Sequence, residues 1–291
     1  MTHVITLVAD RTATTLSDAI IARVCGAIQG GPPRILSPGE AADIPCKTIP
    51  TQATLAEALG DAPVDTIATK ARNRRKGLLV ADMDSTIVTS ETLDELAAYA
   101  GLKDQIAAIT KRSMNGELDF SEALRERVGM LKGLPLDALE KTWRRTQLTP
   151  GARELVATMR AHNATTALVS GGFTYFTSRV AAQLGFDIHR ANTLLDDGAA
   201  LTGEVGEPIL DRDAKLATLR ELAAARNLQI SATLAVGDGA NDLAMIREAG
   251  LGMAFRAKPI VAAEARAQVR HGNLRALLFA QGYRLEEIKA D

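Results

Sequence analysis

Two aspartates, Asp82 and Asp84, follow a short apolar run in the segment LLVADMDSTIVTSET, residues 78–92. Residues two apart in an extended segment face the same side, so both carboxylates can point into one crevice. Such a pair can supply a nucleophile, a general acid or base, or metal ligands. Because an isolated D-x-D pattern is also common in turns and helix caps, the pair needs support from elsewhere in the sequence.

A second acidic group, GDGANDLAM at residues 237–245, also follows an apolar run. It contains Asp238, Asn241 and Asp242, and a capped turn is its ordinary structural explanation. If this loop meets the first pair, four carboxylates converge, and such a cluster requires a cation or raised pKa values. Oxygen ligands without cysteine or histidine favour a hard ion, Mg²⁺ before Ca²⁺.

Two further patterns suit a phosphate group. LVSGGF, residues 168–173, places the Ser170 hydroxyl and two glycines between a predicted strand and a predicted helix. Glycines let the backbone approach an anion and a helix N-terminus donates N–H groups, although an ordinary strand-to-helix turn has the same pattern. Lys215 heads the helical segment KLATLRELAAA and could neutralise a phosphate and a carboxylate, whereas most helix lysines are simply solvated.

The elements that would position these residues alternate along the chain from Gly77 onwards. Amphipathic helical segments separate apolar β-type runs at residues 77–82, 164–170, 232–238 and 250–255. This alternation predicts an α/β fold with a doubly wound parallel sheet. Such sheets bind ligands at the carboxyl ends of their strands, where Asp82, Ser170 and Asp238 are expected.

Three other segments complete the predicted organisation. Residues from about 90 to 150 are helical in pattern throughout, which predicts a cap inserted after the first core strand, and residues 194–205 predict a hairpin that turns at Asp197-Gly198. Residues 1–72 form a small α+β N-terminal domain with strands at 3–9 and 64–70. The basic stretch 70–77 predicts a linker or solvated hinge, with a phosphate patch as the weaker alternative.

Composition excludes several classes of function. The chain has 291 residues, 46% hydrophobic residues, a net charge of -1 and 3% aromatics, which argues against nucleic-acid and membrane-surface partners. Cys25 and Cys46 form no metal-binding or disulfide pattern. Neither a signal peptide nor a membrane-spanning apolar run is recognisable, so we expect a cytoplasmic protein.

Together these motifs resemble a known family. DMDST, LVSGG, Lys215 and GDGANDLAM match, in order and approximate spacing, the four motifs of the haloacid dehalogenase-like (HAD) phosphotransferases over about residues 77–260. Within that family, VTSETLDELA, KRSMNGELDFSEALRERVGML and GDGANDLAMI resemble the L-phosphoserine phosphatases. The resemblance implies a HAD-like Rossmannoid phosphatase domain over residues 73–291 and a Mg²⁺ cofactor.

The resemblance also implies roles for the motif residues. Asp82 would attack phosphorus to form an aspartyl-phosphate, and Asp84 would act first as general acid and then as base. Ser170 and the Gly171 N–H would hold the phosphoryl oxygens, with Lys215 neutralising charge. Further expected positions are the Mg²⁺ ligands Asp82, Asp84 (by its main-chain oxygen) and Asp238, the supporting Asp242, and the substrate-binding Asn241.

The resemblance of the cap motifs implies the substrate, O-phospho-L-serine, which would be hydrolysed to L-serine and phosphate in the last step of serine biosynthesis. Glu91 would contact the substrate ammonium and Arg127 its carboxylate, with Phe120 facing the substrate. From the residues alone, Glu91 and Arg127 could be surface ion pairs, and Phe120 and Met114 could be packing residues of the cap.

Other functions remain open at this stage. One alternative is hydrolysis of a different small phosphomonoester, or phosphoryl transfer to another alcohol. An amino-acid-sensing protein without catalysis is the alternative from another class. Residues 1–72 weakly resemble ACT-type regulatory domains, but a structural or dimer-forming domain fits equally well, so a homodimer is one allowed assembly.

Overall fold

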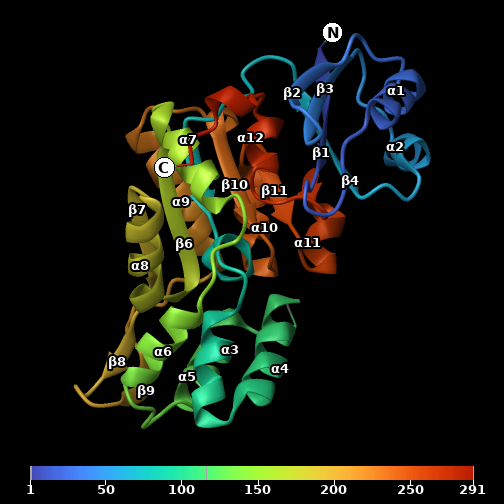
Figure 1. Cartoon of the computed structure of the whole chain (residues 1–291). Helices are drawn as coiled ribbons and strands as arrows, with labels where there is room; N and C mark the ends of the chain where they lie inside the picture. Colours follow the sequence, from blue (N-terminus) through green and yellow to red (C-terminus); the bar gives the residue numbers. More distant parts are fainter. Residues whose placement is uncertain (1, 116, 291) are drawn as a thin grey trace.

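The computed structural model describes residues 2–115 and 117–290, arranged in three parts (Figure 1). An N-terminal part (blue) lies against the C-terminal helices of a central core, and a helical cap (teal and green) covers one end of that core. Within the described residues no helix has the length and hydrophobicity needed to span a bilayer.

The N-terminal part is a four-stranded antiparallel sheet with two helices. Its elements are β1 (His3–Ala9), α1 (Asp18–Ala27), β2 (Arg34–Ser37), β3 (Ala41–Cys46), α2 (Gln52–Leu59) and β4 (Val64–Lys70). The order β2-β3-β1-β4 is that of a ferredoxin-like β-α-β-β-α-β unit. The helices begin after Ser17 and Thr51, whose hydroxyls accept N–H bonds from the first turn. The sequence predicted only two of these strands, because β2 and β3 are short and flank a Pro-Gly turn.

The core is a six-stranded sheet in which every pair is parallel. Its strands are β5 (Leu78–Ala81), β6 (Thr165–Phe173), β7 (Ile188–Asn192), β10 (Thr233–Gly237), β11 (Leu251–Phe255) and β12 (Ala267–Val269). Their order is β12-β11-β10-β5-β6-β7, so the first strand of the core lies in the middle of the sheet. The predicted parallel sheet is confirmed.

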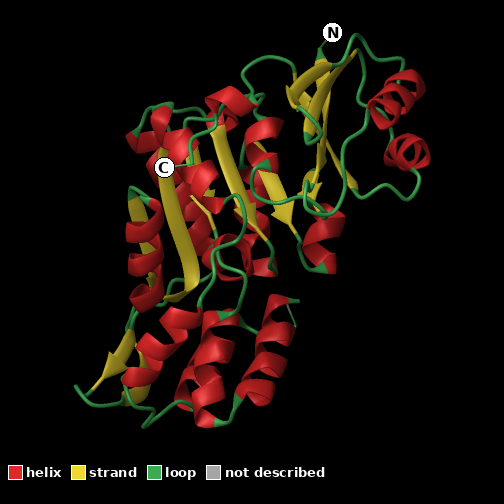
Figure 2. Ribbon diagram, in the orientation of Figure 1, coloured by secondary structure: helices red, strands yellow, loops and turns green. Residues whose placement is uncertain are grey.

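Helices cover both faces of this sheet (Figure 2). Alternate residues of β5 pack on opposite sides: Leu79 and Ala81 join one apolar cluster, and Leu78 and Val80 join the other. The first cluster includes α7 (Ala152–Ala161), α8 (Thr174–Leu184) and α12 (Ala276–Ala280). The second includes α9 (Arg212–Ala225), α10 (Leu243–Glu248) and α11 (Pro259–Glu264). The sheet is therefore doubly wound, as predicted.

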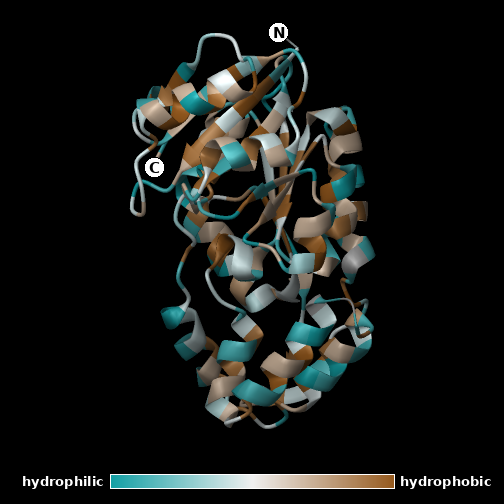
Figure 3. Cartoon of the chain, turned by 90° about the vertical axis from the view of Figure 1, so that its right-hand side faces the viewer, coloured by the Kyte–Doolittle hydropathy of each residue, from teal (hydrophilic) through white to brown (hydrophobic). Residues whose placement is uncertain are grey.

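The cap combines helices with the predicted hairpin. It consists of α3 (Thr92–Ala97), α4 (Lys103–Met114), α5 (Phe120–Gly129), α6 (Asp137–Arg145), β8 (Leu194–Asp196) and β9 (Leu201–Val205). Its helices are amphipathic (Figure 3), and Leu96, Leu124 and Val128 extend the first core cluster into the cap. Gly198 has a φ of 90°, which its predicted turn requires. The side chain of Met114 lies outside what the structure describes.

Residues 70–77 form a linker in which Lys70, Arg72, Asn73 and Arg75 are exposed, as predicted, but Arg74 is held between the two parts of the chain. The Arg74 side chain is 11% exposed and binds Asp43 Oδ2 at 2.5 Å. It also donates to Thr6 Oγ1 at 2.9 Å and to the carbonyls of Phe279 and Ala280 at 3.1 Å each. One arginine thus joins β1 and β3 to α12, because the guanidinium is large enough to reach all of these acceptors at once.

A second contact fastens the N-terminal part to the edge of the core. The Asp65 carboxylate on β4 accepts N–H bonds from Arg270, His271 and Gly272, the shortest being 2.7 Å from Gly272. These residues follow β12 directly, so β4 lies beside the edge strand of the core. The two sheets are consequently held together by buried polar contacts.

Candidate active site

Asp82 and Asp84 lie together where β5 ends, although not in the extended segment that the sequence predicted. The strand ends at Ala81, and the chain turns at Ser85, which has a left-handed φ of 55°. This conformation is uncommon for a residue with a side chain. Both aspartates line one pocket and are buried, with Asp82 3% and Asp84 7% exposed.

Lys215 brings the two acidic loops together. Its Nζ lies 2.5 Å from Asp82 Oδ1 and 2.5 Å from Asp242 Oδ1. The other oxygen of Asp242 accepts N–H bonds from Asp238 at 3.1 Å and Gly239 at 3.0 Å. Both oxygens of Asp242 are therefore occupied, which agrees with a supporting position that orients Lys215.

Burial sets the protonation of this group. It raises the pKa of Asp82 to about 7, against the lowering effect of Lys215, and Asp242 raises it further. Burial alone would lower the pKa of Lys215, but Asp242 and Asp82 raise it above its ordinary value. Burial and the Asp82 charge raise the pKa of Asp238 well above its usual range. The site has a surplus of carboxylates that a single lysine does not neutralise.

A divalent cation would fit this surplus. Asp82, Asp238 and Asp242 each offer one carboxylate oxygen within 4.8 Å of the others. Asp238 Oδ2 is buried without a hydrogen bond, and the nearest cation, Lys258 Nζ, is 3.7 Å away. Since Asp242 is already occupied, Asp82 and Asp238 are the carboxylates available to a metal ion. An all-oxygen donor set suits Mg²⁺.

Asp84 is held between the cap and the end of β6. Its Oδ1 accepts the Thr92 N–H at 2.7 Å and its Oδ2 accepts the Ser170 hydroxyl at 3.3 Å. The Gly172 N–H in turn donates to Ser170 Oγ at 2.8 Å. Burial, followed by the charge of Asp82, raises the pKa of Asp84 to about 6. A carboxyl group that titrates near neutral pH can both donate and accept a proton.

The strand β6 continues further than the sequence predicted, so Ser170 lies within it and not after it. β6 extends to Phe173, and α8 begins at Thr174. A Cβ atom on Gly171 would lie 2.6 Å from Phe120 Cζ, and one on Gly172 would lie 2.7 Å from Asp84 Oδ2. The two glycines are therefore required for the close approach of strand, cap and catalytic loop.

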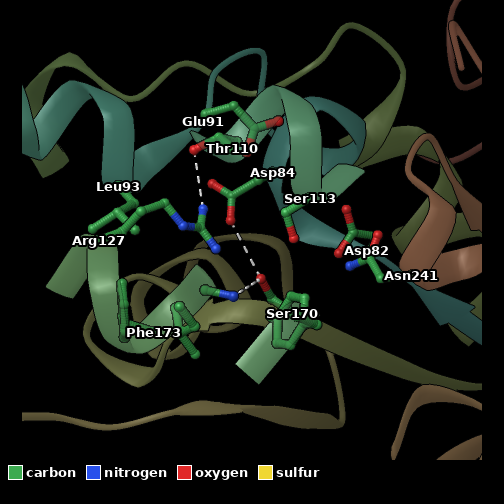
Figure 4. Close-up of a pocket in the computed structure, with 14 residues that line it drawn as sticks. Asp82, Asp84, Glu91, Leu93, Thr110, Ser113, Arg127, Ser170, Phe173 and Asn241 are labelled. Carbon is green, nitrogen blue, oxygen red and sulfur yellow. Dashed lines mark hydrogen bonds between the residues drawn. The ribbon is translucent and has the colours of Figure 1, made fainter. Parts of the chain in front are cut away.

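The pocket extends from these residues to the cap (Figure 4). It encloses about 530 Å³, part of it open to solvent. Asp82 and Asn241 lie on one side in Figure 4, Arg127 lies on the other, and Asp84 lies between them. Asn241 Oδ1 is buried without a hydrogen bond, and Phe120 both lines the pocket and packs against the cap.

The cap side of the pocket carries one acidic and one basic side chain, Glu91 and Arg127. Glu91 Oε1 accepts the Ser85 hydroxyl at 2.6 Å, and burial, followed by the charge of Asp84, raises the pKa of Glu91 to about 7. Arg127 is 7% exposed and donates to Ala123 O and Thr110 Oγ1 at 3.0 Å each. These hydrogen bonds leave the guanidinium without a direct carboxylate partner in the described residues.

The structure thus brings the predicted residues into two adjoining layers. Asp82, Asp84, Glu91, Phe120, Arg127, Ser170, Gly171 and Asn241 line the pocket. Lys215, Asp238 and Asp242 lie beneath that lining.

Sequence reasoning missed the residues that orient others. They are Ser85, Thr110 and Gly172, which hold Glu91, Arg127 and Ser170 respectively. Ser85 and Gly172 belong to the DMDST and LVSGG motifs, so their position in those motifs was an available signal. Thr110 carried none, because a threonine in an amphipathic helix resembles any other packing residue.

Comparison with known proteins agrees with this geometry. The family model of haloacid dehalogenase-like hydrolases matches residues 79–247. A phosphoserine phosphatase of Streptococcus thermophilus is 47% identical over 199 residues, which are 68% of this chain and 93% of that protein. One of Streptomyces coelicolor is 42% identical over 238 residues, but these are 82% of this chain and only 58% of the longer relative.

Solved structures extend the likeness to the whole chain. A probable phosphoserine phosphatase of Vibrio cholerae is 33% identical, with a TM-score of 0.79, over 98% of this chain and 88% of that one. A structure described as a phospho-aspartyl intermediate analogue of phosphoserine phosphatase is 39% identical, with a TM-score of 0.68, over 70% of this chain and 98% of that one. The chain belongs to the haloacid dehalogenase-like hydrolase family.

Proposed function

We propose that this chain is a Mg²⁺-dependent phosphoserine phosphatase, which hydrolyses O-phospho-L-serine to L-serine and phosphate. One observation carries the proposal: a single pocket is lined by two pairs of charged residues, Asp82 with Asp84 and Glu91 with Arg127. A substrate with a phosphate at one end and an amino-acid group at the other matches both. Relatives named phosphoserine phosphatase that are 42% and 47% identical support the same assignment.

In the first step, an Asp82 carboxylate oxygen attacks phosphorus and the bond from phosphorus to the seryl oxygen breaks. Asp84 gives its proton to the departing oxygen, which leaves as the serine hydroxyl. Lys215 stays bonded to Asp82 and Asp242, and this bond fixes the attacking carboxylate. Ser170 and the neighbouring backbone hold the phosphoryl oxygens while charge develops on them.

In the second step, the ionised Asp84 removes a proton from a water molecule. The water oxygen attacks phosphorus of the aspartyl-phosphate, the bond from phosphorus to Asp82 breaks, and phosphate leaves. Asp84 is protonated again and Asp82 is free, so the cycle closes. The buried position and near-neutral pKa of Asp84 suit both halves of this exchange.

Asp82, Asp238 and the main-chain oxygen of Asp84 would hold Mg²⁺, which would neutralise the phosphate dianion and the acidic pocket. At the other end, Glu91 faces the substrate ammonium and Arg127 its carboxylate through charge-assisted hydrogen bonds. Phe120 closes the pocket over the reacting group.

The wider setting follows from the reaction. The enzyme would work in the cytoplasm, as the last step of serine biosynthesis. The division into an N-terminal domain (1–72) and a phosphatase domain (73–291) is part of the proposal, as are ACT-like character in the former and a homodimer. The ferredoxin-like strand order of the N-terminal sheet supports the ACT-like assignment.

Trapping the intermediate tests the mechanism. Labelled phosphoserine, quenched in acid during turnover, should leave label on the Asp82 peptide, and Asp82→Asn should leave none. A panel of small phosphate esters tests the substrate, and we expect phosphoserine to have the highest kcat/KM. A higher kcat/KM for another ester, or phosphoryl transfer to an added alcohol in place of water, would identify a different member of the family.

A further inference from the structure

A second groove lies at the junction of the N-terminal part and the core, away from the active site. It encloses about 730 Å³, part of it open to solvent, and its walls come from α2, β4 and the segment around β12. Asp65, which ties the two parts together, lies in its floor. The proposed phosphatase reaction uses none of the residues that line this groove.

One wall of the groove carries positive charge. Arg266 and Arg270 flank β12, are exposed and line the groove together with Gln268, whereas Ala267 and Val269 are buried. In the described part of the chain, the Arg266 side chain has no hydrogen-bond or ion-pair partner. The Arg270 guanidinium contacts only Gln268 Oε1, at 2.9 Å.

The acidic group in the groove makes no hydrogen bond to the side chains of these arginines. Asp65 is 4% exposed and its two oxygens are occupied by the N–H groups of residues 270–272. The wall therefore presents two guanidinium groups without a carboxylate. Guanidinium groups in this state bind carboxylate and phosphate oxygens through paired hydrogen bonds.

The opposite wall is a largely apolar face of α2. Gln52, Leu55, Ala56 and Leu59 follow helical spacing and all line the groove. Leu55 and Leu59 are buried, whereas Ala56 is exposed. A ligand between the walls would meet positive charge on one side, and Ala56, Gln52 and the edges of the buried leucines on the other.

We infer that this groove binds a small organic anion. Its carboxylate or phosphate group would bond to Arg266 and Arg270, and its carbon skeleton would lie against Ala56 and the edges of the α2 leucines. Such a ligand would bridge the two parts of the chain and stabilise their junction by binding only the folded state.

Calorimetric titration of the Mg²⁺-loaded full chain at low ionic strength tests this inference, with succinate and inorganic phosphate as probes. The double variant R266Q/R270Q should weaken binding at the groove at least about tenfold, since each charged hydrogen bond contributes that order of affinity. Ala56→Asp, which places a negative charge on the opposite wall, should weaken it as well. R112Q/R144Q, which removes two exposed cap arginines, is the charge-matched control and should bind as the wild type does.

The two probes distinguish a carboxylate ligand from a phosphate ligand. If the groove binds carboxylates, the groove variants should weaken succinate binding, and if it binds phosphates, they should weaken phosphate binding. Arg127→Ala reports succinate binding and Ser170→Ala reports phosphate binding in the catalytic pocket, and both variants should leave the groove component unchanged. Equal affinity of R266Q/R270Q and its control for both probes would refute the site. So would loss of all succinate binding in Arg127→Ala, or of all phosphate binding in Ser170→Ala. Because no turnover is measured, these outcomes do not depend on the proposed phosphatase reaction.

Discussion

The two ends of the active-site pocket hold their charges in different ways. At the core end, Lys215 is 1% exposed and bonds directly to Asp82 and Asp242. At the cap end, Glu91 and Arg127 are each held by a neutral hydroxyl group. Direct ion pairs fix the reacting groups, whereas hydroxyl contacts leave the cap residues free to exchange partners when a substrate arrives. On the proposed function, the same pocket would combine a fixed reaction site with an adjustable recognition site.

Removing Lys215 should have the largest effect. Lys215→Met leaves Asp82 and Asp242 buried without their cation, so we expect the free energy of unfolding to fall by about 3–5 kcal/mol. We expect kcat to fall about 100- to 1,000-fold, as for loss of a group that stabilises transition-state charge. Urea unfolding and steady-state kinetics measure the two effects.

The control is Lys141→Met, which breaks an exposed pair with Asp137 of similar length, 2.7 Å. It should change stability by less than about 0.5 kcal/mol. Equal losses of stability in Lys215→Met and Lys141→Met would mean that burial does not strengthen the ion pairs of Lys215.

At the cap end, Arg127→Ala should affect specificity more than chemistry. Loss of a charged hydrogen-bond donor should lower kcat/KM for phosphoserine about 30- to 150-fold. We expect less than about a threefold loss for a simple aryl phosphate, which has no carboxylate to bind. Arg125→Ala, on the exposed side of the same helix, should leave both values near wild type. Similar losses on both substrates would contradict the role of Arg127.

The two glycines of β6 should separate the ends of the pocket. Gly172→Ala places a Cβ 2.7 Å from Asp84 Oδ2, so kcat should fall about 10- to 100-fold. Gly171→Ala places one 2.6 Å from Phe120 Cζ, so KM should rise more than kcat falls. Gly26→Ala in α1, with nothing within 4 Å, is the control and should be neutral. If the two β6 variants changed kcat and KM in the same way, Gly171 and Gly172 would not act on different parts of the pocket.

A smaller effect is expected for Ser85→Ala. The variant removes the 2.6 Å hydrogen bond to Glu91, because alanine lacks the hydroxyl group. A hydrogen bond contributes about 0.5–1.5 kcal/mol, so KM for phosphoserine should rise about two- to tenfold with little change in kcat. Retention of the wild-type KM would show that Glu91 needs no orienting partner.

The last prediction concerns pH and the metal ion. Burial raises the pKa values of Asp82 and Asp84 to about 7 and 6, so folding favours their protonated forms. The stability that these two groups contribute to the metal-free protein should therefore be fully present below about pH 4 and be lost as pH rises from there through 6 and 7. Mg²⁺ requires the ionised carboxylates, so it should raise Tm by more at pH 8 than at pH 5.5. Thermal unfolding with and without Mg²⁺ checks this, and an equal rise at both pH values would contradict it.

The catalytic motifs were more predictable from the sequence than the elements around them. Asp82, Ser170 and Asp238 were expected at the ends of parallel strands because long alternation of apolar runs and amphipathic helices specifies that sheet. The cap and the hairpin at Asp197-Gly198 were predictable because helical periodicity and an Asp-Gly turn are strong local signals.

The remaining features depend on tertiary contacts that no local pattern encodes. The strands β2 and β3 gain their stability from pairing with β1 across a distant part of the sequence. In the sequence, Arg74 looks like a solvated charge, because its contacts with Asp43 and the end of α12 form only in the folded chain. Ser85 and Thr110 matter through partners that only the folded chain supplies.

The contact made by the N-terminal sheet has a consequence for how the molecule comes apart. Val8, Leu36, Ala41 and Ile67 belong to the same apolar cluster as the helices α7 and α12 of the core. Cutting the chain after this sheet would uncover that cluster to water, at a cost that grows with every exposed methyl group. One face of the N-terminal sheet is therefore a wall of the core, while its other face and the helices α1 and α2 keep an apolar cluster of their own.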